Sequence, residues 1–390
     1  MLLLAVLLAA CGGDPAPAPA PERGLIATVP AGTPAPTGPG ELRAADELGT
    51  VTAAAVAEAV ATPGVRVPAI RPVYDVRTLR LSYLTRDGQG REILASGLLA
   101  LPLKSRGTIS PVVSVQHGTI FRDAEAPSNN ATATEPAVVM ASLGYIVLAA
   151  DYVGYGVSKG APHPYLLAAP TAAAVLDLLG AADAWGRRQG VHGNGQLFLV
   201  GYSEGGYATM AAHRAMQETP HRFLPVLVGS APAAGPFDVN ATLDELLRRV
   251  RRENPALALL VEPGLLRFLG SSVRREVRDR LLEALLPDDA DVVFQTEFID
   301  RYLADDRKAN ERDANVHDWR PDAPVRLFHG RDDQTVPFVA SQNALDAMHA
   351  RGAPDVTLQE CVAEPAGHLP CVLPYWSYML SQMALVVRDL

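Results

Sequence analysis

Short apolar segments alternate with longer helical segments over most of this chain, and this alternation restricts its fold more than any other feature. The apolar runs lie at 111–116, 145–150, 196–200, 225–229, 325–328 and 356–360. Helices are expected at 133–143, 170–189, 204–217, 339–351 and 374–388. Continuous apolar strands separated by helices indicate a mostly parallel sheet with both faces covered. We therefore expect an α/β fold.

Two segments before this alternation have a different pattern. Ala-rich apolar positions that end at Pro63-Gly64 predict a helix over 41–62. Apolar alternation over 76–84 and a second apolar run over 91–101 flank the turn residues Asp87-Gly88. Such a pattern predicts an antiparallel hairpin.

A third segment, about 236–319, is helical in pattern throughout and separates two predicted strands. A direct crossover would not need so long an insertion, so we expect a helical cap over the carboxyl edge of the sheet. The basic cluster at 248–252 is expected to lie on a solvated helix face. The domain that carries this cap should span 41–390.

The N-terminus has the pattern of an export signal. Residues 2–10 are apolar but too short to span a bilayer. Residues 8–12 resemble the lipobox of bacterial lipoproteins, which implies that residues 1–11 are a signal segment and that Cys11 carries a lipid anchor. An ordinary cleaved signal peptide, and hence a secreted protein, is the alternative. The Pro-, Ala- and Gly-rich segment 12–40 predicts an extended tether.

Composition restricts the classes of partner and cofactor, and the cysteines allow a disulfide. The net charge of -9 argues against a nucleic-acid partner. The histidines show no metal-binding spacing, so neither a metal nor a cofactor is expected. In an exported chain Cys361 and Cys371 can form a disulfide, with two buried free thiols as the alternative. That disulfide would brace the loop that contains His368.

One five-residue motif, Gly201-Tyr202-Ser203-Glu204-Gly205, carries the strongest chemical signal. It follows the apolar run 196–200 and opens an Ala-rich helix. A serine in such a strand-to-helix turn is exposed, and the glycines avoid collisions with neighbouring backbone. The turn resembles the nucleophile elbow of α/β-hydrolases, which implies that Ser203 is the nucleophile.

The same resemblance implies an acid and then a base further along the chain. Two aspartates follow the strand at 325–328, and the pattern Gly-x-x-Asp-x-x-Val-Pro favours Asp333 as the acid, with Asp332 as a turn residue. His368, in a Gly- and Pro-bounded loop after the last strand, is the expected base. The other candidates were His317, which precedes a strand, and His349, on an expected helix.

Backbone N–H groups should stabilise the oxyanion that forms during ester hydrolysis. One donor is expected at Glu204, the residue after the nucleophile. The loop after 111–116 contains His117-Gly118-Thr119, in which Gly118 permits a close approach and Thr119 supplies the second N–H. A plain turn is the alternative interpretation of this loop.

Beyond the elbow, the chain resembles the secretory lipase family of acylhydrolases over about 75–390. The residues that carry the resemblance lie at 83–85, 95–102, 151–156, 163–166 and 201–205. The family implies a carboxylic ester hydrolase with a helical cap. Fungal members have a cysteine where this chain has Glu125, so their substrate preferences are not carried over.

Three residues near the expected site have weaker roles. Asp151 follows a strand at the catalytic edge and is expected to hold its loop by hydrogen bonds rather than act chemically. Tyr152 and Tyr155, together with Gly118, are candidates for the substrate pocket, although a packing role explains the tyrosines equally well.

These features predict an exported serine carboxylic ester hydrolase, an esterase or lipase that acts through an acyl-enzyme on a small-molecule or lipid ester. The Leu-rich cap suggests an apolar acyl pocket. A serine peptidase on the same fold is one alternative. A binding lipoprotein on an inactive hydrolase scaffold is another, although the intact order of Ser203, Asp333 and His368 disfavours it.

Overall fold

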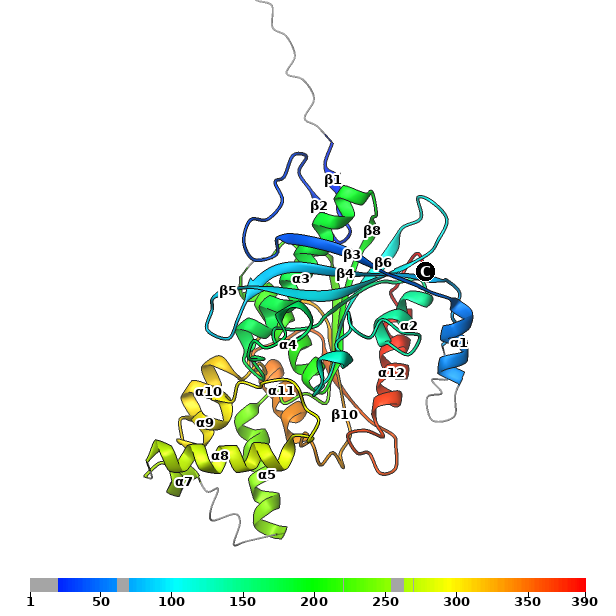
Figure 1. The fold of residues 1–390 in the computed structure, drawn as a ribbon. Coiled ribbons are helices and arrows are strands. Elements are labelled where there is room, and N and C mark those ends of the chain that lie inside the picture. Colours follow the sequence, from blue (N-terminus) through cyan, green and yellow to red (C-terminus); the bar gives the residue numbers. More distant parts are fainter. Residues whose placement is uncertain (1–19, 62–69, 220, 254–262, 269) are drawn as a thin grey trace, which may run out of the picture.

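The computed structural model describes residues 20–390 except 62–69, 220, 254–262 and 269 (Figure 1). The strands are β1 Glu22–Arg23, β2 Thr28–Val29, β3 Leu42–Val51, β4 Val76–Arg86, β5 Glu92–Pro102, β6 Ser110–Gln116, β7 Ile146–Ala150, β8 Gly193–Tyr202, β9 Leu227–Ala233, β10 Val325–His329 and β11 Val356–Glu360. The α-helices are α1 Ala53–Ala61, α2 Pro136–Ser142, α3 Ala168–Gln189, α4 Glu204–Glu218, α5 Val239–Glu253, α7 Pro263–Leu266, α8 Ser271–Leu285, α9 Glu297–Leu303, α10 Arg307–Asp313, α11 Val339–Ala350 and α12 Val372–Ala384. Three short 3-10 helices are η1 Asp123–Glu125, η2 Gly156–Ser158 and η3 Leu224–Val226.

Most of the described strands form one sheet, in the order β11-β10-β9-β8-β6-β7-β5-β4-β3. The pairings from β11 to β7 are parallel, whereas β7–β5, β5–β4 and β4–β3 are antiparallel. The predicted α/β fold with a mostly parallel sheet is therefore confirmed, and so is the hairpin, which is the β4–β5 pair.

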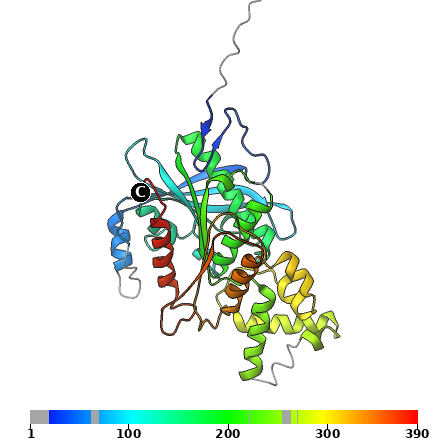
Figure 2. The same ribbon diagram turned by 180° about the vertical axis from the view of Figure 1, so that it is seen from behind.

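Helices cover both faces of the sheet, which explains the continuous apolar strands. Figure 1 shows α3 and α4 on one face, and Figure 2 shows α12, α2 and α1 on the other. Each face has its own apolar core, one around α3 and α4 and one around α2 and α12. β6 and β7 lie between them and are buried along their whole length. A strand buried on both faces cannot alternate polar and apolar residues.

The helix expected over 41–62 is wrong in its first half. Leu42–Val51 forms β3, an edge strand that pairs antiparallel with β4, and only Ala53–Ala61 is helical. The residues after 61 that were expected to end the helix lie outside the described part. Ala, Leu and Glu favour helix, but the free edge of β4 offers backbone hydrogen bonds that local propensity does not take into account.

The tether expected over 12–40 is wrong for residues 24–29, which pack against the folded domain. Leu25 has no exposed surface, and Ile26, Ala27 and Val29 are buried with it against the α3 face of the sheet. The backbone N–H of Ile26 donates to a carboxylate oxygen of Asp183 on α3 at 2.9 Å. The apolar run 25–29 thus anchors this segment, although the surrounding Pro and Ala residues dominate its composition. Residues 12–19 lie outside the described part.

The expected cap is helical. Between β9 and β10 the described residues form α5 and α7–α10, which lie together beyond one end of the sheet (Figure 1). This end is where the parallel strands have their carboxyl termini, because β10 leads into the loop that carries Asp333. The cap therefore lies on the side of the sheet where an α/β fold places its site.

Candidate active site

Ser203 lies in a strained turn between β8 and α4. Its φ is 60° and its ψ is -124°, a backbone conformation that few non-glycine residues adopt. A Cβ on Gly201 would lie 2.2 Å from the Gly205 carbonyl oxygen, and one on Gly205 would lie 2.0 Å from that of Gln116. The glycines of the motif are thus required by close backbone contacts. The Ser203 N–H donates to the Ala233 carbonyl on β9 at 2.9 Å, which ties the turn to the neighbouring strand.

The structure brings together the three residues expected to do the chemistry. His368 Nε2 lies 2.9 Å from Ser203 Oγ, and His368 Nδ1 lies 2.6 Å from Asp333 Oδ2. The other carboxylate oxygen, Oδ1, accepts the backbone N–H groups of Thr335 and Val336 at 2.8 and 2.9 Å. With the His368 ring donating from Nδ1 to the carboxylate, Nε2 is free to accept the serine proton.

Electrostatics keep this acid ionised. Asp333 has no exposed surface, and burial by itself raises the pKa of its carboxyl. Hydrogen bonds from His329 and His368 oppose burial and hold the pKa well below its usual range. His329 Nε2 lies 3.2 Å from Asp333 Oδ2, while its Nδ1 contacts Ser341 Oγ at 2.7 Å. Sequence reasoning missed His329, although it directly precedes the acid-bearing loop.

The other candidates occupy different positions. Asp332 accepts the Ala366 N–H at 2.9 Å and so ties the acid loop to the base loop, which is a structural role. His349, on α11, contacts the Val356 carbonyl oxygen at 3.0 Å. His317 Nε2 lies 3.7 Å from a carboxylate oxygen of Asp238. The histidine next to Ser203 is His368.

The loop that carries His368 is held at both ends and in the middle. A disulfide joins Cys361 and Cys371, the pair that the sequence predicted. Tyr202, inside the nucleophile motif, donates its hydroxyl to the His368 carbonyl oxygen at 2.7 Å. The base is therefore positioned through its backbone as well as through its ring.

The expected oxyanion donors flank the nucleophile. A Cβ on Gly118 would lie 3.6 Å from Ser203 Cβ, so this loop packs directly against the turn. Thr119 follows it, and its hydroxyl lies 3.0 Å from the Tyr165 hydroxyl. Glu204 is the first residue of α4, and the first N–H groups of a helix have no partner within the helix. Glu204 therefore follows Ser203 directly, and Thr119 follows the glycine that packs against the turn.

The tyrosines proposed for the pocket pack beneath this loop instead. Tyr152 is 1% exposed and donates to the His117 carbonyl oxygen at 3.3 Å. Tyr155 has no exposed surface and donates to the Ile120 carbonyl oxygen at 2.8 Å. Burial lowers the pKa of the His117 imidazole, which lies 4.3 Å from the Tyr152 ring. These contacts support the packing interpretation and not the pocket one.

Asp151 holds its surroundings by hydrogen bonds. Its carboxylate accepts the Ser128 N–H at 2.8 Å and the hydroxyls of Ser128 and Ser96 at 2.5 and 2.6 Å. It has no exposed surface, and among the described residues its carboxylate bonds to Ser96 and Ser128 rather than to Ser203 or His368. The expected structural role is therefore the one that its contacts support.

The cap reaches the site through α5. Arg249 donates from Nη2 to the Asp333 carbonyl oxygen at 2.9 Å, and its side chain is only 16% exposed. The interpretation of the basic cluster as a solvated face is therefore wrong for Arg249. The sequence could not reveal this contact, because Arg249 and its partner Asp333 lie 84 residues apart.

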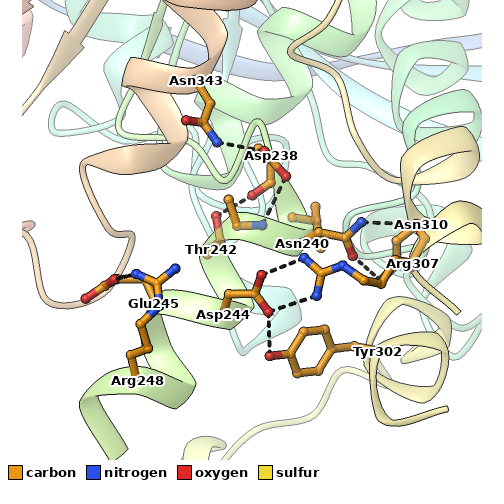
Figure 3. A network of polar contacts seen from close by, with 12 residues as sticks. Asp238, Asn240, Thr242, Asp244, Glu245, Arg248, Tyr302, Arg307, Asn310 and Asn343 are labelled. Atoms are coloured by element: carbon orange, nitrogen blue, oxygen red, sulfur yellow. Dashed lines mark hydrogen bonds and ion pairs between the residues drawn. The ribbon is translucent and has the colours of Figure 1, made fainter. Parts of the chain in front are cut away.

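Polar contacts fix α5 relative to the rest of the molecule (Figure 3). Asn343 on α11 donates to Asp238 Oδ2 at 2.8 Å, just before α5 begins. Asp244 on α5 accepts Arg307 Nη1 at 2.9 Å and the Tyr302 hydroxyl at 3.0 Å. Burial opposes ionisation of Asp244, but these bonds prevail and lower the pKa of its carboxyl. Helix α5 is thus joined to the sheet domain through α11 on one side and to α9 and α10 of the cap on the other.

Within the described ranges, no three His, Cys, Asp or Glu side chains gather as ligands for a metal ion. None of the helices in those ranges combines the length and the apolar character needed to cross a bilayer. Cys11 and the apolar segment before it lie outside these ranges.

Comparison with known proteins adds a family and a set of similar folds. A model of the alpha/beta hydrolase family matches residues 132–384. No curated protein sequence matches the chain. Among solved structures, the rice cell wall degrading esterase LipA from Xanthomonas oryzae has 23% identity and a TM-score of 0.69, with 90% of this chain and 100% of that one covered. Lipase A from Candida antarctica, in its closed state, has 16% identity and a TM-score of 0.57, with coverages of 90% and 84%. At these identities the likeness shows a shared fold.

Proposed function

The chain belongs to the alpha/beta hydrolase family, and we propose that it is a serine carboxylic ester hydrolase that acts through Ser203, His368 and Asp333. The observation that carries this proposal is the pair of hydrogen bonds that links Ser203 Oγ, His368 and Asp333, at 2.9 and 2.6 Å. In the proposed reaction His368 takes the Ser203 proton as the oxygen attacks the ester carbonyl, and returns it to the leaving alcohol. Water then releases the acid from the acyl-enzyme in the same way.

The N–H groups of Thr119 and Glu204 are proposed to stabilise the tetrahedral oxyanion. Their placement beside Ser203, in the loop after β6 and at the start of α4, supports this role. Donors that are fixed before the reaction lower its barrier because they need no reorganisation when charge develops.

A fluorophosphonate probe tests the nucleophile. Wild type should be labelled and Ser203→Ala should not, while Ser381→Ala, which changes an exposed serine on α12, should be labelled like wild type. Labelling that persists in Ser203→Ala would show that another residue reacts. A folded wild type that takes no label would favour a binding protein on an inactive hydrolase scaffold.

The ester substrate is tested by comparing p-nitrophenyl esters of increasing acyl length with aminoacyl anilides. The likeness in fold to an esterase and a lipase supports esters as the substrate class. Faster turnover of the anilides would assign the same site to a serine peptidase.

We also propose that the protein is exported and anchored to a membrane through a lipid on Cys11. The disulfide between Cys361 and Cys371 supports export, because disulfides persist mainly in oxidising compartments. Cys11→Ser should shift the protein from the membrane fraction to the soluble fraction and remove the lipid mass from the N-terminal peptide. A Cys11→Ser variant that stays in the membrane fraction would contradict the anchor, and a wild type found only in the soluble exported fraction would favour a secreted protein.

A further inference from the structure

A buried hydrogen bond between a histidine and a carboxyl group lies next to the nucleophile turn, because Glu204 directly follows Ser203. His163 Nε2 is 2.7 Å from Glu204 Oε1, and both side chains are 2% exposed. The other ring nitrogen, Nδ1, lies 2.9 Å from the Val153 carbonyl oxygen, which can only accept a hydrogen bond. The ring therefore donates from Nδ1, and one further proton must lie between Nε2 and the carboxyl oxygen. This pair fixes the side chain of the residue whose N–H is the proposed oxyanion donor.

The same short segment also contacts the second donor. Two residues after His163, the Tyr165 hydroxyl lies 3.0 Å from Thr119 Oγ1. The Tyr165 N–H donates to the His163 carbonyl oxygen at 2.8 Å, so the segment is compact. His163 and Tyr165 thus contact the side chains of Glu204 and Thr119, the two residues whose backbone N–H groups flank Ser203.

The cap holds this segment in place. The His163 N–H donates to the Val293 carbonyl oxygen at 2.7 Å, and the Gln295 N–H donates back to the His163 carbonyl oxygen at 2.8 Å. The Phe294 ring packs edge-on against the rings of both His163 and Tyr165, with centroids 5.5 Å away in each case. Residues 293–295 belong to the segment between β9 and β10, so the cap contacts the same segment, 163–165, that contacts Glu204 and Thr119.

We propose that the segment His163–Tyr165 is a brace that positions both oxyanion donors, and that His163 and Tyr165 are positioning residues for the hydrolysis. The inference rests on the proposed function, because it needs an oxyanion at Ser203. An oxyanion hole stabilises only the transition state, so loosening the brace should lower kcat and leave KM nearly unchanged.

The test compares kcat in four variants. Each kcat is divided by the concentration of active sites, which is measured by titrating Ser203 with a fluorophosphonate. His163→Ala and Glu204→Ala should each lower kcat by about a hundredfold, the lower end of the loss when a donor is removed. Glu204→Gln should recover at least about tenfold of this, because its amide can donate to His163 Nε2. Tyr165→Phe, which deletes only a hydroxyl and so should still fold, should lower kcat by about fivefold. The matched control is Tyr83→Phe, which removes a buried hydroxyl bonded to the Ala174 carbonyl oxygen at 2.7 Å and should keep the wild-type kcat.

A second readout separates positioning from general damage. A trifluoromethyl ketone forms a tetrahedral oxyanion on Ser203, so its inhibition constant should rise by the same factor as kcat falls across the series. The brace is refuted if Tyr165→Phe and Glu204→Ala keep kcat within about twofold for each titrated serine, or if kcat falls while the ketone binds as in wild type. A wild type that takes no label overturns the proposed function and this inference together, whereas a labelled wild type with unaffected variants overturns the inference alone.

Discussion

Replacing Asp333 by asparagine should abolish most of the hydrolytic rate because it moves the His368 ring proton from Nδ1 to Nε2. The two backbone N–H groups of Thr335 and Val336 donate to Asp333 Oδ1 at 2.8 and 2.9 Å. In Asp333→Asn the amide oxygen must keep this position, because two buried donors would otherwise lose their acceptor. The amide NH2 then faces His368 Nδ1, which becomes an acceptor. The ring proton moves to Nε2, where it blocks uptake of the Ser203 proton.

The size of the effect follows from the loss of the base. A triad with the wrong histidine tautomer loses roughly 10⁴-fold in kcat, which corresponds to about 5 kcal/mol in the activation barrier. Asp332→Asn is the matched control: the Asp332 carboxylate accepts only the Ala366 N–H among the acid-loop contacts described, and an amide oxygen can replace it. Hydrolysis of a p-nitrophenyl ester, with circular dichroism to verify folding, measures both. A loss of less than about a hundredfold in folded Asp333→Asn, or a larger loss in Asp332→Asn, would refute the assignment of the acid.

Three further predictions concern stability. Opening the Cys361–Cys371 disulfide, by reduction or by the double serine variant, should lower the free energy of unfolding by roughly 3 kcal/mol, because the unfolded chain is no longer constrained by the closed loop. It should also lower kcat, because the loop that carries His368 is held less firmly. An unchanged melting temperature would contradict the first expectation. Burial raises the pKa of Glu135 to about 8, so the folded state holds a proton that the unfolded state has released above about pH 5. The stability that this proton contributes should be fully present below that pH and be lost as pH rises to 8. Glu135→Gln should flatten this decline in the free energy of unfolding, measured by denaturant titration. A parallel decline in the variant would assign the pH dependence to another group. Ser128→Ala should lower the free energy of unfolding by about 2 kcal/mol, since it removes a hydroxyl that bonds to the buried Asp151 carboxyl and accepts from Arg80 Nε. It should keep kcat per active site; a loss of kcat without a loss of stability would give Asp151 a part in the chemistry.

The features that could be predicted from sequence are those whose cause is local. The turn at Ser203 needs glycines at 201 and 205 because a Cβ at either position would collide with backbone, and this need leaves a five-residue pattern. The strands from β6 to β10 could be predicted because they lie inside the sheet, where burial on both faces favours apolar residues along a short run. The order of acid and base could be predicted because each lies in the loop after its own strand.

The features that sequence could not predict depend on a distant partner. Residues 42–51 have a helical composition, and what makes them a strand is the edge of β4, some thirty residues later. Leu25 is buried because α3 offers it a surface, whereas the composition of the surrounding residues indicates only an extended chain. A property that arises from two segments has no signature in either one alone.

Glu204 has one feature that the sequence could predict and one that it could not. Its backbone N–H could be assigned from sequence, because the first helical residue after a nucleophile has an unpaired donor that faces the reacting oxygen. Its side chain pairs with His163, 41 residues earlier, and the spacing between them has no pattern that a single sequence could reveal. The chemistry of the site is therefore encoded locally, while the positioning of that chemistry is encoded by contacts between segments. Variants in the segment 163–165 should accordingly change kcat more than KM, because this segment contacts the residues whose N–H groups are the proposed oxyanion donors.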